Sequence, residues 1–164
     1  YGLINGSKKF ALVNTISLSG VRTNVSFTAG ITPSTLNFVA GELAVGNVYN
    51  LSIIGNLTKV GGSTSSITLT FAGYAYNITL PTAATIHNYT IEVKFVVRNL
   101  SPTVGTIIAS HFYNVGVSPT ALTESVTGYS TTANTTGAFT FTGTYSSNNA
   151  SNSFDMYMCH MQRI

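Results

Sequence analysis

The feature of this chain that most limits its possible folds is an alternation of apolar and polar residues in steps of two. In "SITLTFAG", the apolar residues Ile67, Leu69 and Phe71 are separated by Thr68 and Thr70. The segments "YAYNITLP", "TIEVKFVVR" and "GAFTFTGTY" repeat the pattern. Because residues i and i+2 point to the same face of a β-strand, each segment is predicted to be a strand with one buried and one solvated face. We therefore expect an all-β fold of antiparallel strands.

Turn-forming residues interrupt the alternation about every ten residues, for example at "SG" (19–20), "GG" (61–62) and "NLSPTVG" (99–105). This spacing predicts an antiparallel β-sandwich or barrel of about eight to ten strands. The longest predicted strands, 86–98 and 103–115, are joined by a Pro-Gly turn and should form a central hairpin. The chain has no recognisable linker or repeat, so residues 1–164 are predicted to form a single domain.

The surface of the predicted sandwich is unusually poor in charge. Charged residues make up 7% of the chain, far below the usual value of about 25%, whereas the apolar content of 44% is ordinary. Ser, Thr and Asn must therefore provide solubility. The basic residues are scattered rather than clustered, so no nucleic-acid partner is predicted. No apolar run is long enough to span a membrane, so membrane insertion is not expected.

The sequence offers little from which to build a catalytic or metal site. The histidines lie on separate predicted strands, and each acidic residue is alone in its segment: Glu42, Glu92, Glu124 and Asp155. Cys159 is the only cysteine, and we interpret it as a small buried apolar side chain rather than a reactive thiol. The chain is therefore predicted not to be an enzyme and to use no cofactor or metal.

Asn-x-Ser/Thr triplets are frequent, and two interpretations compete. They begin at Asn5, Asn24, Asn50, Asn56, Asn77, Asn88, Asn99, Asn134 and Asn149. In the first interpretation they are glycosylation sites, with Asn50, Asn56, Asn134 and Asn149 as the candidates. In the second they are the solvated faces of strands, because residues i and i+2 share a face and the middle residue points inward. We favour the second.

The final segment, "FDMYMCHMQRI", is apolar at both alternate sets of positions. A strand in the middle of the sandwich would explain this pattern. The sharper hypothesis is that one face packs against another subunit, because Met and aromatic side chains suit subunit interfaces. On that hypothesis the interface residues are Met156, Tyr157, Met158 and Met161.

The segment "LNFVAGELAVGNVYNLSIIGNLT", with glycines at positions 41, 46 and 55, is followed by "SSITLTFAGYAYNITLP" and "NYTIEVKFVVRN", and the chain ends on a strand closing with "QRI". This order resembles the jelly-roll head domains of viral fibres and spikes and related minor capsid proteins, from about residue 10 to residue 164. The resemblance implies a jelly-roll sandwich at the virion surface or outside cells. It also implies a homo-oligomer, a trimer first and a pentamer second, that binds a protein or glycan on the host cell. Because the chain begins "YGLING", we expect it to be the C-terminal fragment of a longer fibre or spike chain.

Three tyrosines near predicted loop ends are the candidate receptor contacts: Tyr113, Tyr129 and Tyr145. The alternative is that they cap the edge of the core. Two rival functions also remain open. One is a purely structural capsid or decoration subunit. The other is a cellular or bacterial carbohydrate-binding module, which the absence of Trp makes less favoured.

Overall fold

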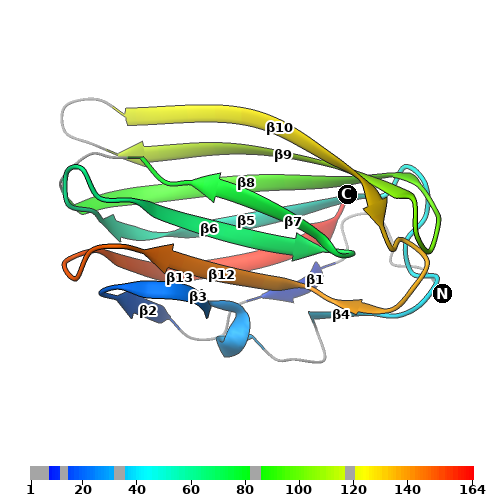
Figure 1. Ribbon diagram of the computed structural model, residues 1–164, viewed down its shortest axis with the longest axis horizontal. Coiled ribbons are helices and arrows are strands. Elements are labelled where there is room, and N and C mark those ends of the chain that lie inside the picture. The colour runs from blue at the N-terminus through cyan, green and yellow to red at the C-terminus, as the bar shows by residue number, and fades with distance from the viewer. Residues whose placement is uncertain (1–7, 12–14, 32–35, 82–85, 117–120) are drawn as a thin grey trace.

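The computed structural model describes residues 8–11, 15–31, 36–81, 86–116 and 121–164. Most strands in these residues form two antiparallel sheets that lie face to face (Figure 1), and two short strands form a separate pair. The predictions of an all-β fold and of an antiparallel β-sandwich are confirmed. The predicted hairpin of long strands is also present, since 86–99 and 105–116 pair inside the larger sheet, with one further strand on the outer side of 105–116.

The large sheet has the order β1-β13-β5-β8-β9-β10, and β2 also pairs with β13. Its strands are β1 (Lys8–Ala11), β2 (Ile16–Ser19), β5 (Val48–Thr58), β8 (Ile86–Asn99), β9 (Gly105–Gly116), β10 (Ala121–Ala133) and β13 (Ser153–Arg163). The small sheet has the order β3-β12-β6-β7, made of β3 (Arg22–Ser26), β12 (Thr142–Ser147), β6 (Ser65–Phe71) and β7 (Tyr74–Thr79). The short strands β4 (Asn37–Phe38) and β11 (Phe139–Thr140) pair with each other, and a 3-10 turn, η1, covers Thr28–Gly30.

The described residues contain thirteen strands, more than the turn spacing predicted. The additional strands are short. Both β1 and β2 pair with β13, at its end and at its beginning, and act as one interrupted edge strand. The segment "GAFTFTGTY", predicted as one strand, is divided at Phe141 because β11 pairs with β4 whereas β12 pairs with β3 and β6.

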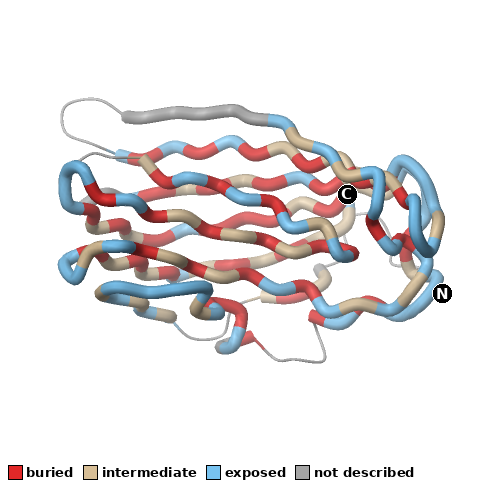
Figure 2. The backbone as a smooth tube through the Cα atoms, viewed as in Figure 1, coloured by how far each residue is buried: buried red, intermediate tan, exposed pale blue. Residues whose placement is uncertain are grey.

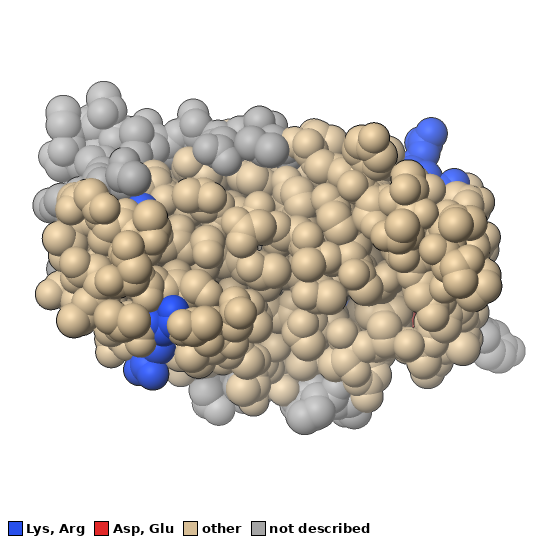
Figure 3. Space-filling model, viewed as in Figure 1, with Lys and Arg blue, Asp and Glu red and all other residues tan. Residues whose placement is uncertain are grey.

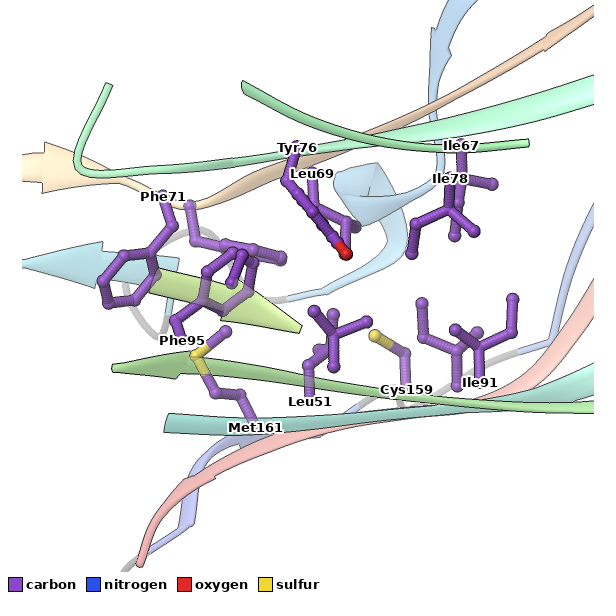
Figure 4. Close-up of a cluster of buried hydrophobic side chains, with 14 of the residues drawn as sticks. Leu51, Ile67, Leu69, Phe71, Tyr76, Ile78, Ile91, Phe95, Cys159 and Met161 are labelled. Carbon is purple, nitrogen blue, oxygen red and sulfur yellow. The ribbon is translucent and has the colours of Figure 1, made fainter. Parts of the chain in front are cut away.

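The alternation in the sequence corresponds to the alternation of burial along the strands (Figure 2). Apolar residues of both sheets are almost completely buried between them, including Ile67, Leu69 and Phe71 of β6 and Ile91 and Phe95 of β8. Figure 4 shows these side chains pointing toward one another from opposite sheets. The predicted inward and outward faces of β6 and β8 are therefore correct.

One buried polar contact links the two sheets. The hydroxyl of Tyr76 on β7 and Nδ1 of His111 on β9 lie 2.7 Å apart, at hydrogen-bond distance. Both side chains are buried, and the His111 ring stacks on Tyr113 with ring centroids 5.9 Å apart. A buried polar group is costly unless it is paired, so this contact favours one relative position of the two sheets.

The final strand contains a β-bulge, which corrects its predicted faces. Met156 pairs with Gly55 and Met158 pairs with Ile54, so Tyr157 is an extra residue. The bulge reverses the alternation: even-numbered residues face the core before Tyr157, and odd-numbered residues face it afterwards. The core side chains of β13 are Phe154, Met156, Cys159 and Met161. Most of the apolar residues predicted on two faces of this strand therefore lie on one face, at even positions before the bulge and at odd positions after it. The strand lies inside the sheet.

Candidate functional site: the outer face of the large sheet

The outer face of the large sheet brings together polar side chains from four neighbouring strands. The strand register places two rows across this face. One row runs from His160 on β13 through Ser52 and Glu92 to Phe112 on β9. The neighbouring row consists of Gln162, Asn50, Lys94 and Ser110. These residues form the candidate site.

Glu92 is held in place by its neighbours on β5. The hydroxyl of Ser52 lies 2.6 Å from each carboxylate oxygen, and Asn50 donates from Nδ2 to Oε2 at 3.0 Å. Ser52 is buried, so its contact with the charged carboxylate is shielded from solvent. The Oδ1 atom of Asn50 is also shielded, and it has no hydrogen-bond partner among the described residues.

Two open hollows meet at Glu92 and Phe112. The first has a volume of about 520 Å³ and is lined by both residues together with Asn50, Lys94 and Gln162, among others. The second has a volume of about 430 Å³ and is lined by both residues and by Asn88, Thr90 and Asn114. Because they share these two residues, the hollows adjoin each other along β8 and β9. We call the pair of hollows the β8–β9 groove.

The groove contains one negative and one positive side chain that do not neutralise each other directly. Glu92 and Lys94 point to the same face of β8, but no ion pair joins them. Within the described part of the chain the only ion pair is that of Lys9 with Glu42, 2.8 Å apart and remote in the fold. The carboxylate of Glu92 can therefore still accept hydrogen bonds from a bound molecule, and the ammonium group of Lys94 can donate to one.

Phe112 is the most unusual residue of the groove. Its side chain is 46% exposed, although its neighbours on β9, His111 and Tyr113, are buried. A second exposed aromatic, Tyr129 on β10, lies outside the groove in an apolar row with Ile108, Val96 and Val48. The outer face of the large sheet therefore carries both exposed aromatic rings and hydrogen-bonding groups.

The structure separates the three tyrosines predicted as receptor contacts. Tyr145 is fully buried and stacks on Phe154, with centroids 5.1 Å apart, and Tyr113 is buried beside His111. Neither ring is available at the surface of a single chain, as expected of residues that cap the core. Tyr129 is 72% exposed and is available. The three do not lie together in one site.

The predicted interface residues are also divided. Met156 and Met161 are fully buried in the chain's own core, so their apolar character needs no second subunit to explain it. Tyr157 is 49% exposed, and Met158 is half-buried beside Ile54, which is itself exposed. Of the predicted set, only Tyr157 and Met158 reach the outer face.

The four glycosylation candidates occupy different environments. Asn50 and Asn56 lie on β5, and each uses its Nδ2 within the sheet, toward Glu92 and toward the Tyr157 hydroxyl at 2.6 Å. Asn134 is exposed in a turn, where its Oδ1 accepts the Gly137 amide, and Asn149 is half-buried. The middle residues of the triplets at Asn50, Asn56, Asn77 and Asn88 are all buried, as the strand-face interpretation requires.

Sequence reasoning missed the groove residues, although one signal pointed to Phe112. In "GTIIASHFYNVG", placing Ile107, Ala109 and Val115 inward by the rule of two also places His111 and Tyr113 inward and Phe112 outward. A large aromatic residue on the solvated face is then the anomaly. The pairing of Glu92 with Ser52 could not be found this way, because it depends on the register between β5 and β8.

The outer face of the small sheet provides a contrast. Basic side chains appear only toward the ends of the face shown in Figure 3, and almost no acidic surface is visible. A hollow of about 460 Å³ on this face is lined mainly by Ser, Thr and Asn and by no aromatic residue. The small sheet thus has hydrogen-bonding groups without the aromatic platform of the β8–β9 groove.

The described residues contain no group of three or more His, Cys, Asp or Glu side chains that could hold a metal ion. They also contain no helix with the length and apolar character needed to cross a membrane. No family model, curated protein or solved structure matches this chain.

Proposed function

We propose that this chain is the jelly-roll head domain of a virion fibre or spike, which attaches the particle to a host-cell receptor as a homo-oligomer without catalysing a reaction. The observation that carries the proposal is the order of strand pairing. Eight of the strands, in chain order, are β2, β3, β5, β6, β7, β8, β12 and β13, which leaves out β1, β4, β11 and the hairpin of β9 and β10. The first pairs with the last, the second with the seventh, the third with the sixth and the fourth with the fifth.

This nested pairing supports a jelly roll, because it results when one long antiparallel hairpin is rolled into two facing sheets. The hairpin of β9 and β10 extends the large sheet beyond β8 and leads back to the small sheet. The additional hairpin enlarges the outer face on which the β8–β9 groove lies. Strand order of this kind is what the resemblance to viral head domains implies for the fold.

The surface chemistry is compatible with attachment. The exposed aromatic ring of Phe112 is a large, rigid contact group that loses little entropy on binding. The extended strands beneath it form a rigid base. Several copies in one oligomer would present their rings together, and multivalency would raise the affinity for a cell surface.

The first test of the proposal is the oligomeric state. We expect size-exclusion chromatography with light scattering to give a stable species of three times the 17.3 kDa mass of one chain, with five times that mass as the second possibility. The reason is that attachment heads gain avidity only when several copies act together. A monomer at micromolar concentration would contradict the proposal and favour a monomeric carbohydrate-binding module, which the exposed ring of Phe112 in the groove also suits.

A paired substitution tests the proposed subunit contact at Tyr157 and Met158. The double change Tyr157→Ser and Met158→Ser should reduce the oligomer to monomers at micromolar concentration, because it removes the apolar area that these two residues offer. Tyr129→Ser is the matched control, since it removes a more exposed aromatic ring from another strand. If both variants remain oligomeric, the subunit contact lies elsewhere on the chain.

A further inference from the structure

We infer that the β8–β9 groove is a binding site for a neutral oligosaccharide, with Phe112 as the stacking platform and Glu92 and Lys94 as the hydrogen-bonding groups. The inference rests on the proposed attachment function and goes further by naming the receptor class and the site. None of the residues involved belongs to the predicted receptor-contact set, which consisted of tyrosines elsewhere in the chain.

The first observation is the combination of an aromatic ring with hydrogen-bonding side chains. A pyranose ring has one face of C–H groups and an edge of hydroxyl groups, so it binds where an exposed aromatic ring lies beside polar side chains. In the groove, Phe112 is 46% exposed and lies directly across from Glu92 in the strand register. The aromatic face and the carboxylate therefore reach the same bound ring.

The second observation is the charge balance. Glu92 supplies acceptors and Lys94 supplies donors, and apart from His111 the other polar side chains of both hollows are amides and hydroxyls, as in Asn88, Asn114 and Gln162. The charges of Glu92 and Lys94 sum to zero. A neutral molecule with many hydroxyl groups matches this lining, because each hydroxyl can both donate and accept a hydrogen bond. An anionic molecule would meet the carboxylate of Glu92.

The third observation is that the site is preorganised. Ser52 and Asn50 fix the carboxylate of Glu92 before any ligand arrives, which lowers the entropic cost of binding. The Oδ1 atom of Asn50 has no hydrogen-bond partner among the described residues. Unsatisfied buried acceptors are rare in native proteins, so this oxygen, in a residue that lines the groove, is a candidate acceptor for a ligand hydroxyl.

The fourth observation is the shape of the groove. The two hollows have volumes of about 520 Å³ and 430 Å³ and share Glu92 and Phe112. Each is large enough for a single sugar ring with its hydration, and the pair accommodates adjacent rings of one chain. An oligosaccharide that extends along both hollows would contact Phe112 at its centre, where a binding hot spot is usually found.

The experiment compares variants on a printed array of neutral galactose-, N-acetyllactosamine- and mannose-terminated oligosaccharides together with their sialylated counterparts. The wild-type oligomer should bind at least one neutral oligosaccharide. Phe112→Ala and Glu92→Gln should each weaken that binding by about tenfold or more, whereas Phe112→Tyr should retain it. Tyr129→Ala, which removes an exposed ring outside the groove, is the matched control and should bind like the wild type.

Three results would overturn the inference. They are binding to no neutral oligosaccharide, binding to sialylated ones only, or equal binding by wild type and Phe112→Ala. Thermal unfolding of each variant checks that its fold is intact, which the exposure of Phe112 favours. In the third case the attachment function stands and only the site is wrong, because the wild type still binds. In the first case the oligomeric state and binding to a panel of cultured cells decide separately whether the attachment function survives.

Discussion

Replacing Gly55 with alanine should destabilise the fold by more than about 4 kcal/mol, enough to unfold a domain of ordinary stability. A Cβ atom at this position would lie 1.8 Å from the carbonyl oxygen of Asp155 and 2.6 Å from the hydroxyl of Tyr89. The first neighbour is backbone of the adjacent strand, and it cannot move aside without separating β5 from β13. Urea unfolding followed by circular dichroism measures the loss.

The cause of this close approach is the β-bulge in β13. The bulge begins next to Asp155, and the Tyr89 hydroxyl donates to the Asp155 carbonyl at 3.0 Å. The Tyr89 ring also stacks on Phe154, with centroids 5.1 Å apart. Only a residue without a side chain leaves room for this arrangement. Packing therefore requires glycine at position 55. At Gly41 and Gly46 the backbone conformation favours glycine instead, because their φ angles are positive, 77° and 87°.

A matched control is available on the neighbouring hairpin. At Gly116 an added Cβ would have its nearest neighbour, the Asn88 carbonyl oxygen, at 3.5 Å, an ordinary contact distance. Gly116→Ala should therefore change the free energy of unfolding by less than about 1 kcal/mol. If Gly55→Ala lowers the free energy of unfolding no more than Gly116→Ala does, β5 does not approach Asp155 as closely as described.

Much of the fold could be predicted from the sequence because a strand with one buried face repeats in steps of two. That rule placed Ile67, Leu69 and Phe71 in the core and identified the hairpin of β8 and β9. It failed in β13 because Tyr157 is one residue more than the alternation allows. A bulge depends on the partner strand, in this case on the room that Gly55 leaves, and a single strand's pattern does not contain it.

The candidate site was less predictable than the core. Tyrosines near loop ends were the predicted contacts, yet Tyr113 and Tyr145 are buried, and Phe112 is the exposed ring in the groove. Identifying Phe112 as the exposed ring of β9 required the inward and outward assignment of that strand to be carried through residue by residue. The hydrogen bonds of Glu92 come from residues about forty positions earlier, on β5, so only the sheet register reveals them.

Raising the pH above 9 should remove a large part of the stability of this protein. Burial raises the pKa of Cys159 from 9.0 to about 12. Burial, helped by the carboxylate of Glu42 and opposed by Arg163, raises the pKa of Tyr49 from 10.0 to about 12. Burial also raises the pKa of Tyr89 well above 10.0. All three groups hold their protons more tightly in the folded chain than in the unfolded chain.

The sign of the effect follows from this difference. Below pH 9 both states keep these protons, so the stability is fully present. Above the unfolded pKa, the unfolded chain loses the proton and the folded chain does not, so each group lowers the free energy of unfolding by about 1.4 kcal/mol per pH unit. By pH 12 the loss amounts to about 4 kcal/mol for Cys159 and about 3 kcal/mol for Tyr49.

One group acts in the opposite direction. Lys59 is buried, its Nζ donates to the Leu80 carbonyl at 2.9 Å, and burial lowers its pKa. The folded chain releases this proton more readily, so Lys59 adds stability as the pH rises toward 10.5. Its contribution ends there, whereas the losses from Cys159 and Tyr49 continue to about pH 12. The net effect in strongly alkaline solution is destabilisation.

Urea midpoints at pH 8, 9, 10 and 11 and constant ionic strength measure the loss, and refolding after return to pH 8 excludes irreversible chemistry. Cys159→Ala is the decisive variant. At pH 8 it should be less stable than the wild type by about 1–2 kcal/mol, because a buried side chain is shortened. Above pH 9 it should lose stability less steeply, since the alanine has no proton to release. Parallel curves for the two proteins would show that the Cys159 thiol is exposed to solvent and does not lie between the two sheets.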